Sequence, residues 1–373
     1  MTFYFFIRRI FIGILFFAPF LASQSQKNKA LRIGVAGLTH THVHWIFNSA
    51  KNGDIEIVGI AEANRELAER YAKQYNFPAN KIYKSLGDLI EAQKPEAVTA
   101  FNSTFEHLEV VEICAPKGIH VMVEKPLAVS LDHARKMQAL ATKNKIFLLT
   151  NYETTWYNTV HQTYYLIHDS ASIGPMRKIV IHDGHKGPKE IGVNKEFLDW
   201  LTDPILNGGG ALMDFGCYGA DLSTWLMKGK KPLSVTAVTQ QIKPGVYPKV
   251  DDEATIVLTY PSSQTIIQAS WNWPFSRKDM EVYGKNGSIT ARDRNSLSFR
   301  FNEKKMDSII TVPERKSPYH DPFSFFKSVI RREIILEEND LSALPTNMIV
   351  MEILEAARES ALKGKTIYLK SSN

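Results

Sequence analysis

Short apolar runs alternate with amphipathic segments along the first half of the chain. Five of these runs have the length and composition of strands, and they lie at 31–36, 55–61, 97–101, 119–123 and 146–149. Helical periodicity marks the segments between them, at 42–50, 64–75, 85–93, 106–117 and 130–144. Strands that alternate with helices predict βαβ units in a doubly wound parallel sheet. We therefore expect an N-terminal Rossmann domain over residues 30–150.

After residue 150 the pattern changes to short strands joined by turns. Strands are expected at 235–240, 254–260, 265–273, 280–283, 288–292 and 296–301, and Lys285-Asn286-Gly287 is a hairpin signal. Helical segments follow at 322–335 and 346–363, and Gly364 stands where a helix should stop. The sequence therefore predicts a C-terminal α/β domain over residues 151–370, with a large and mostly antiparallel sheet.

The N-terminal segment is apolar but does not fit either domain. Residues 10–22 form an apolar stretch after Arg8 and Arg9, and a polar Ser-Gln run follows. This pattern is typical of a signal peptide, which we place at residues 1–23, and it predicts export to the periplasm. The arginine pair fits either a general secretory signal or a twin-arginine signal. Contact with a membrane is expected only if this segment stays uncleaved.

Composition narrows the class of protein. A length of 373 residues suffices for two domains, and the formal charge of +6 is spread along the chain. Binding to nucleic acid needs a clustered basic patch, so we expect no nucleic-acid partner. Two cysteines, Cys114 and Cys217, provide neither a disulfide framework nor a set of metal ligands.

A glycine-containing turn follows the first predicted strand. Gly37 occupies the first position of the G-x-G-x-x-G spacing, whereas Thr39 and His42 replace the second and third glycines. Amides at the start of a helix attract phosphate, so the position favours nucleotide binding. His40, His42 and His44 also permit a metal cluster. Alternating histidines at such a turn should not all face one point, and we expect no metal there.

An acidic residue ends the second predicted strand. Glu62 lies about 25 residues after Gly37, where a carboxylate can bind the ribose hydroxyls of NAD and repel the 2′-phosphate of NADP. The alternative is a solvated charge at a strand end. Arg65 is near in sequence, so NADP remains a second candidate.

Glu124-Lys125-Pro126 ends the predicted strand at 119–123. Burial favours the neutral form of a lysine, and a lysine with a lowered pKa can exchange a proton near pH 7. Proline permits a cis peptide bond, which would help to orient Lys125. The alternative is a surface turn with a salt bridge.

A second glycine-rich segment, 207–210, runs into a helix. Asp214, Tyr218 and Asp221 stand at i, i+4 and i+7 and should share one helix face. A carboxylate and a phenol one turn apart suit the binding and protonation of a polyol. The alternative is a capped helix with a buried tyrosine.

These motifs together resemble the glucose-fructose oxidoreductase / inositol dehydrogenase (Gfo/Idh/MocA) family. The resemblance runs from about residue 31 to residue 369. It rests on Glu124-Lys125-Pro126 with the upstream segment 102–107, and on Gly208-Gly209-Gly210 followed by Asp214 and Tyr218. It implies a Rossmann domain, a second domain with an open sheet used for homo-oligomerisation, a nicotinamide cofactor and a sugar or polyol substrate.

The same resemblance implies roles for individual residues. Lys125 would lie near the nicotinamide and the reacting hydroxyl, Asp214 would orient the substrate, and Tyr218 or Lys125 would take the proton. Asn102 and His107 would line the cofactor pocket. The expected cofactor-binding residues are Gly37, Thr39, His40, His42, Glu62, Asn102, His107, Glu124 and Lys125.

The expected activity is hydride transfer between a sugar or polyol carbon and NAD. An exported dehydrogenase would meet little free NAD, so a tightly bound cofactor that is recycled between two sugars would fit. Two alternatives stay open: a glycoside hydrolase that oxidises its sugar transiently through bound NAD, and a catalytically idle sugar-binding protein. A set of aromatic residues before the glycine-rich segment could form a wall that stacks on sugars: Trp156, Tyr157, His182, His185 and Trp200.

Overall fold

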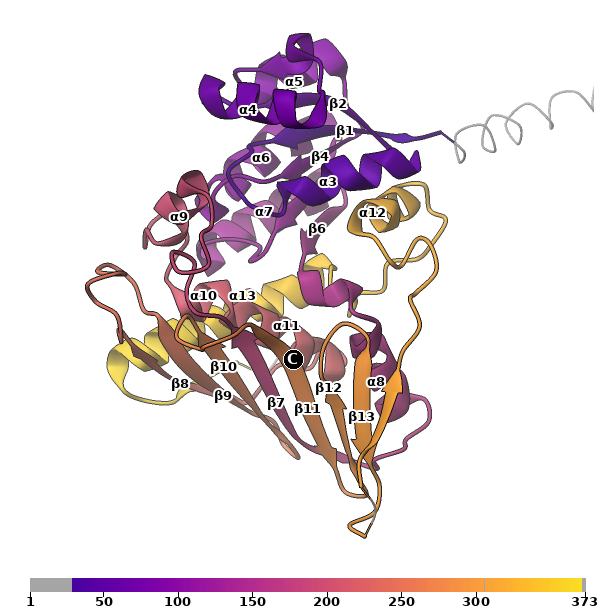
Figure 1. Ribbon diagram of the computed structural model, residues 1–373, viewed down its shortest axis with the longest axis vertical. Helices are drawn as coiled ribbons and strands as arrows, with labels where there is room; N and C mark the ends of the chain where they lie inside the picture. Colours follow the sequence, from indigo (N-terminus) through magenta and orange to yellow (C-terminus); the bar gives the residue numbers. More distant parts are fainter. Residues whose placement is uncertain (1–28, 305, 371–373) are drawn as a thin grey trace, which may run out of the picture.

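The computed structural model describes residues 29–304 and 306–370. It contains two β-sheets with helices packed on them, and Figure 1 shows the sheets in the upper and lower halves of the molecule. The expected signal peptide at 1–23 lies outside the described residues. No helix in the described ranges is long and apolar enough to cross a membrane.

The first sheet has the order β3-β2-β1-β4-β5-β6, and all its strands are parallel. Its strands are β1 (Leu31–Ala36), β2 (Ile55–Ala61), β3 (Ile82–Tyr83), β4 (Ala97–Ala100), β5 (His120–Glu124) and β6 (Leu148–Asn151). The helices between them are α3 (Val43–Ser49), α4 (Arg65–Tyr75), α5 (Leu86–Gln93), α6 (His107–Cys114) and α7 (Leu131–Asn144), with 3-10 turns η1 to η4 at 50–52, 79–81, 104–106 and 115–117. The doubly wound prediction is confirmed.

Local chemistry explains these elements. β4 and β6 are buried at every residue, which is expected for strands covered on both faces by helices. Side chains of Asn64, Ser85 and Ser130 cap the starts of α4, α5 and α7 by accepting backbone N–H groups. Capping and burial therefore agree with the periodicity read from the sequence.

The second sheet has nine strands in the order β14-β13-β12-β11-β7-β10-β9-β8-β15. They are β7 (Met176–Gly184), β8 (Ser234–Gln240), β9 (Glu253–Thr259), β10 (Gln264–Ser270), β11 (Arg277–Gly284), β12 (Ser288–Ala291), β13 (Ser296–Arg300), β14 (Ser308–Thr311) and β15 (Ile367–Tyr368). Only β7 and β10 pair in parallel; the other neighbours are antiparallel. The prediction of a large, mostly antiparallel sheet is confirmed.

The sequence analysis missed β7, although this strand lies in the middle of the sheet. Ile179 and Ile181 face the core with no exposure, whereas the alternate residues Lys178 and Val180 are only half-buried. The apolar part is short because the carboxyl end of the strand carries His182 and Asp183. A strand that ends at a functional cavity thus loses the hydrophobic alternation that reveals a strand.

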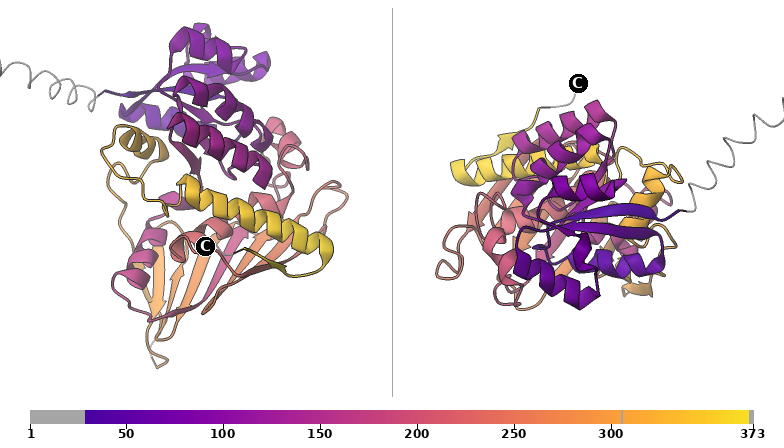
Figure 2. Two further views of the ribbon diagram at one scale, coloured as in Figure 1. Left: turned by 180° about the vertical axis from the view of Figure 1, so that it is seen from behind. Right: turned by 90° about the horizontal axis from the view of Figure 1, so that it is seen from above.

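Helices cover one face of the second sheet. The helices that contact its strands are α8 (Asn158–His168), α10 (Ala211–Asp214), α11 (Gly216–Leu226) and α13 (Leu344–Lys363). The other elements of this half are η5 (Glu153–Trp156), α9 (Lys195–Leu201) and α12 (Pro322–Ile330), and α12 packs against α3 and β2 of the first domain. Figure 2 (left) shows α13 crossing in front of the sheet, below the first domain. Gly364 ends α13 in the left-handed conformation, as the sequence predicted.

The chain returns to the first domain near its end. Phe323 and Phe326 of α12 are fully buried in the same apolar cluster as Leu31 and Phe101. Asp321 caps α12 and also accepts a hydrogen bond from Ser49 Oγ at 2.8 Å. Residues after 320 therefore complete the Rossmann layer as well as the second domain.

Candidate functional site

A cavity of about 750 Å³ lies between the two sheets. Its walls come from the β1–α3 turn, the end of β5, the α10–α11 segment and the strands β7, β11 and β12. Parallel sheets place ligands beyond the carboxyl ends of their strands, and this cavity occupies that position. It is therefore the candidate active site.

Gly37 makes the turn after β1 possible. Its φ is +77°, and a Cβ at this position would lie 2.6 Å from Asn102 Cβ. Only glycine allows this approach of the turn to the segment after β4. Asn102 Oδ1 is buried and has no hydrogen-bond partner among the described residues. Gly37 and Asn102 are thus adjacent, and the free acceptor Asn102 Oδ1 lies between the ends of β1 and β4.

Helix α9 of the second domain covers the turn. Trp200 Nε1 donates to Thr39 Oγ1 at 3.1 Å, and Thr39 Oγ1 donates to the Phe101 carbonyl at 3.3 Å. The His40 ring lies edge-on to Phe197, at 4.8 Å between centroids. A pyrophosphate over the turn would therefore lie against α9. Of the expected wall residues, Trp200 contacts this turn and is not a lining residue of the cavity.

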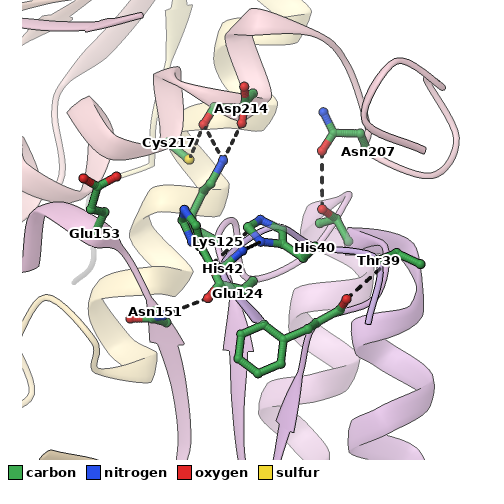
Figure 3. Close-up of polar contacts among 12 residues, drawn as sticks. Thr39, His40, His42, Glu124, Lys125, Asn151, Glu153, Asn207, Asp214 and Cys217 are labelled. Carbon is green, nitrogen blue, oxygen red and sulfur yellow. Dashed lines mark hydrogen bonds and ion pairs between the residues drawn. The ribbon is translucent and has the colours of Figure 1, made fainter. Parts of the chain in front are cut away.

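His40 and His42 both face Glu124 (Figure 3) but His44 does not, so the three histidines do not all face one point, as the sequence predicted. His42 Nδ1 lies 2.9 Å from Glu124 Oε2, and His40 Nε2 lies 3.9 Å from it. Only His44 points elsewhere, to the Tyr75 hydroxyl. Each histidine side chain of this turn is held by a different neighbour.

The hydrogen bonds of His40 argue against a metal ion at this cluster. His40 Nδ1 accepts the backbone N–H of His42 at 3.1 Å, so a neutral ring carries its proton on Nε2. Burial keeps the pKa of His40 well below its usual value, hence the ring is neutral. His40 Nε2 lies 3.9 Å from Glu124 Oε2, beyond hydrogen-bond distance. A metal ion on Nε2 would require the ring proton on Nδ1, which could then no longer accept the N–H of His42.

Glu124 is an ionised acceptor beneath the cavity. Burial would raise the pKa of its carboxyl, but His42, His40 and the amide of Asn151, 2.7 Å away, lower it to about 2. The side chain orients His42, which lines the cavity, and does not itself line it. Glu124 therefore supports the cavity wall from behind.

Glu62 lies at the turn, as expected, but its carboxylate is already occupied. It accepts the backbone N–H groups of Leu38 at 3.0 Å and Asn64 at 2.8 Å. Burial raises its pKa. Arg65, whose nearness in sequence made NADP a second candidate, is exposed and forms an ion pair with Glu69 at 2.7 Å. A ribose would therefore share Glu62 with two amides that shape the turn.

Lys125 and Asp214 form a buried ion pair at the floor of the cavity. Lys125 is 5% exposed and Asp214 is 4% exposed. Lys125 Nζ donates a hydrogen bond to Asp214 Oδ1 and another, at 3.1 Å, to the Asp214 carbonyl oxygen (Figure 3). Cys217 Sγ donates to the same carbonyl oxygen. Trp271 Nε1 donates to Asp214 Oδ2 at 2.9 Å. The Lys125–Pro126 peptide bond is cis.

The pKa of Lys125 does not shift in the expected direction. Burial lowers it, as predicted, but the adjacent Asp214 carboxylate raises it more, and the net pKa lies above the usual value. Burial likewise raises the pKa of Asp214, and the lysine charge brings it below the usual range. At neutral pH the pair is therefore an ammonium that donates a hydrogen bond to a carboxylate.

Tyr218 lines the cavity beside this pair, but not on one continuous helix with Asp214. The chain breaks at Phe215, so that Asp214 ends α10 whereas Tyr218 belongs to α11. Asp221 lies off the cavity, and among the described residues neither of its carboxyl oxygens has a hydrogen-bond partner. Burial raises the pKa of Tyr218 well above its usual value, which makes its phenol a proton donor rather than a base.

Two lysines flank the Tyr218 ring. Lys125 Nζ lies 5.2 Å from the ring centroid and Lys278 Nζ lies 4.7 Å from it. The sequence analysis did not select Lys278, which pairs with Glu153. Lys278 begins β11 inside a charged run, 277–279, and only its approach to Glu153 in space identifies it. A cation on each side favours any negative charge that develops on the phenol.

Other expected residues have mixed positions. His107 is buried, and its Nδ1 lies 3.2 Å from the Leu127 carbonyl, so it supports the chain after Pro126 and is not among the lining residues. Tyr157 and His185 line the cavity. Trp156 is 3% exposed and packs in the core, as aromatic residues usually do.

The residues present suit the nicotinamide end of a dinucleotide. The cavity extends from His40 and His42 at the β1–α3 turn to Lys125 at the end of β5. It therefore connects the turn expected to bind phosphate with the lysine expected near the nicotinamide. Glu62 and the unpartnered Asn102 Oδ1 mark the ribose side. These residues are thus compatible with NAD, although α9 covers the turn where the phosphates would bind.

Comparisons with known proteins agree with this geometry. The model described as "Oxidoreductase family, NAD-binding Rossmann fold" matches residues 31–152, and the "GFO/IDH/MocA C-terminal domain" matches residues 161–290. Trans-1,2-dihydrobenzene-1,2-diol dehydrogenase of Xenopus tropicalis is 25% identical over 315 residues, which cover 82% of this chain and 89% of that protein. The human protein of the same name is 26% identical over 236 residues, covering 62% of this chain and 65% of that protein.

Solved structures share the fold at lower identity. An inositol dehydrogenase homolog from Azotobacter vinelandii, complexed with NAD+, has a TM-score of 0.79 and 17% identity, with 91% of this chain and 98% of that chain covered. The aldose-aldose oxidoreductase of Caulobacter crescentus, complexed with glycerol, has a TM-score of 0.75 and 20% identity, with 91% and 100% covered.

Proposed function

Because this chain belongs to the GFO/IDH/MocA family of NAD-binding oxidoreductases, we propose that it transfers hydride to or from a sugar or polyol carbon. The observation that carries the proposal is the Lys125–Asp214 pair at the floor of a 750 Å³ cavity. The relatives are named for diols, aldoses and inositol, which are polyhydroxylated compounds. An inert binding protein has no need of a buried, hydrogen-bonded ion pair in its cavity.

The proton chemistry follows from the pair. Bound nicotinamide supplies the hydride acceptor or donor. In the oxidative direction, Lys125 Nζ takes the proton of the substrate hydroxyl and passes one of its own to Asp214 Oδ1. The pair then holds one more proton, on Asp214, and the reverse reaction returns it to the carbonyl oxygen. Tyr218 donates a hydrogen bond to the reacting oxygen, since its raised pKa keeps it protonated.

The test is a set of sugars and polyols incubated with NAD+, with nicotinamide absorbance as the readout. We expect at least one to reduce the cofactor, and Lys125→Ala to abolish turnover while nicotinamide binding persists. Lys136→Ala and Asp132→Asn are matched controls, because they break an exposed pair of the same type at 2.8 Å. Full turnover by Lys125→Ala would refute the assignment.

The same assays distinguish a rival activity. A glycoside hydrolase that oxidises its sugar transiently would use these residues as well. Release of nitrophenol from aryl glycosides without net formation of NADH would show that the protein is a glycoside hydrolase rather than a dehydrogenase. Failure of every sugar and glycoside to perturb bound nicotinamide would favour an idle binding protein.

We also propose that the protein is exported and carries its cofactor tightly bound. The signal-like residues 1–23 support export to the periplasm, and α9, which lies against the β1–α3 turn, supports slow exchange of NAD. Cell fractionation with N-terminal sequencing tests export. Release of NAD(H) on denaturation of the purified protein tests retention, and a supernatant free of nucleotide would contradict it.

A homo-oligomer through the open face of the second sheet is a further part of the proposal. The helices cover one face, and the other exposes apolar side chains such as Val238 (63%) and Tyr283 (41%) from different strands. A second copy would bury them. Light scattering on the purified protein tests this, and a monomer at micromolar concentration would refute it.

A further inference from the structure

A second cavity, of about 440 Å³, lies on the other side of Glu153 from the first. It is formed by α3, by η5, by the segment before α12 and by the turn between β12 and β13. Figure 1 shows α3 and α12 side by side at this level of the molecule. The residues that line it are Trp45, Asn48, Ser49, Asn52, Glu153, Trp156, Arg294, His320, Asp321 and Pro322.

The two cavities adjoin along one seam. Glu153 lines both of them. His42 lines the first cavity, and its ring stacks on that of Trp45, which lines the second, at 3.9 Å between centroids. Arg292 lines the first cavity and Arg294 the second, two residues apart on one turn. Glu153 and the stacked rings of His42 and Trp45 thus form the boundary that the two cavities share.

Glu153 is an ionised acceptor at the junction. Burial would raise the pKa of its carboxyl, but the Lys278 ammonium and the Tyr157 hydroxyl lower it to about 2. Tyr157 donates to Oε1 at 2.7 Å and Lys278 to Oε2. Each carboxylate oxygen can accept a second hydrogen bond, so Glu153 can bind a hydroxyl that approaches from either cavity.

The second cavity offers neutral hydrogen-bonding groups beside an aromatic surface. Asn48 and Asn52 contribute exposed amides, and Trp45 is half-buried. His320 Nδ1 is buried and has no hydrogen-bond partner among the described residues. Arg294 lies 5.9 Å from the Tyr157 ring and takes part in none of the ion pairs found in the described ranges. These groups can donate to and accept from hydroxyls.

The charges in this cavity argue against an anionic ligand. Glu153 is ionised at one end, and Asp321 lies at the other, engaged as the cap of α12. A phosphate or carboxylate would therefore meet two carboxylates for the single guanidinium of Arg294. A polyhydroxylated ring avoids this repulsion and uses both the amides and the indole surface.

We propose that the second cavity is a subsite for the second ring of a disaccharide or glycoside, whose reacting sugar occupies the first cavity. This inference rests on the proposed sugar oxidoreductase function. It adds that the natural substrate is a glycoside, with its glycosidic bond beside Glu153. A monosaccharide would fill only the first cavity.

The experiment compares monosaccharides with disaccharides. Glucose and galactose are measured against maltose, cellobiose and lactose, with kcat/KM read from nicotinamide absorbance, or with single-turnover amplitude if the cofactor stays bound. The variants Asn48→Ala, Asn52→Ala and His320→Ala each change a residue that lines the second cavity and not the first. Asn302→Ala is the matched control, because Asn302 is an exposed asparagine that lines neither cavity.

We expect the wild type to prefer at least one disaccharide, and each variant to lower its kcat/KM about five- to tenfold, the effect of one lost hydrogen bond. The kcat/KM of monosaccharides should stay within about twofold of wild type because one uncharged contact outside the first cavity is removed. Equal losses for both sugar classes, no loss for either, or no preference for any disaccharide would overturn the subsite. If no sugar changes nicotinamide absorbance in the wild type, the proposed function fails instead.

Discussion

Replacement of Lys125 by methionine tests the central ion pair, because methionine keeps the length of the side chain and removes its charge. In the wild type, Lys125 Nζ bonds both the carboxylate and the carbonyl of Asp214. In the variant, the indole N–H of Trp271, at 2.9 Å, is the remaining side-chain donor to a carboxylate that is 4% exposed. A buried charge would thus lose its counter-ion.

The expected loss is large. Removing one partner of a buried ion pair costs about 3–5 kcal/mol, since the other charge stays buried and uncompensated. Asp214→Asn should be similarly costly, because it leaves the lysine charge buried. The double variant Lys125→Met/Asp214→Asn should be less destabilised than the sum of the single variants, by about 2–3 kcal/mol.

The pH dependence of the variant has a definite sign. In the wild type the pKa of Asp214 lies below its usual value, so the stability it contributes is present above the unfolded pKa and is lost as pH falls through the folded pKa. Without Lys125, burial dominates and the folded pKa of Asp214 rises above the unfolded value of about 3.9. The folded variant then binds the extra proton, and its deficit relative to wild type should shrink as pH falls from 7 towards 5.

Urea denaturation at pH 7 and pH 5 measures these free energies, and nicotinamide fluorescence checks that the cofactor site persists. Additive losses in the double variant would refute the coupling. The stability deficit of Lys125→Met could also stay constant or grow as the pH falls from 7 to 5. That result would show that Asp214 is not the buried charge left without a counter-ion.

Three further predictions concern the nucleotide side. Gly37→Ala should destabilise the fold by about 1–3 kcal/mol, since φ is +77° and the new Cβ would meet Asn102 at 2.6 Å; an unchanged urea midpoint would contradict this. Trp200→Phe removes the bond to Thr39 and should raise the rate of NADH release about five- to tenfold, measured by stopped-flow fluorescence; a release rate equal to wild type would show that α9 does not retain the cofactor. Glu62→Ala should reduce the preference for NAD over NADP about tenfold; an unchanged ratio of dissociation constants would remove Glu62 from cofactor selection.

The fold was predictable because burial leaves a periodic record. Parallel strands covered on both faces, such as β4 and β6, are continuous apolar runs, and the capped helices between them keep their polar faces. β7 escaped because its carboxyl end carries the polar residues His182 and Asp183 and leads to Gly184 and His185 at the cavity, so this end lacks that record. The elements nearest the chemistry are the hardest to recognise by hydrophobic pattern.

The candidate site was predictable only in part. Lys125 stood out because it follows a buried strand, and Asp214 because it follows a glycine-rich segment. The structure brings the two side chains into contact. The pairing of Lys278 with Glu153 spans 125 residues, and no local spacing announces it. The cover that α9 places on Thr39 is likewise a contact between domains, invisible in either segment alone.

The sequence by itself determined the alternation of strands and helices in the first domain, the parallel and mostly antiparallel character of the two sheets, and the lysine and carboxylate of the site. Each of these depends on periodicity or on residue type within a short segment. Only the tertiary structure decided the protonation of those residues. A buried lysine alone tends towards neutrality, but Asp214, 89 residues away, reverses the sign of its pKa shift. Electrostatic energy depends on distance in space, and two charges distant in sequence acquire their interaction only when the chain has folded.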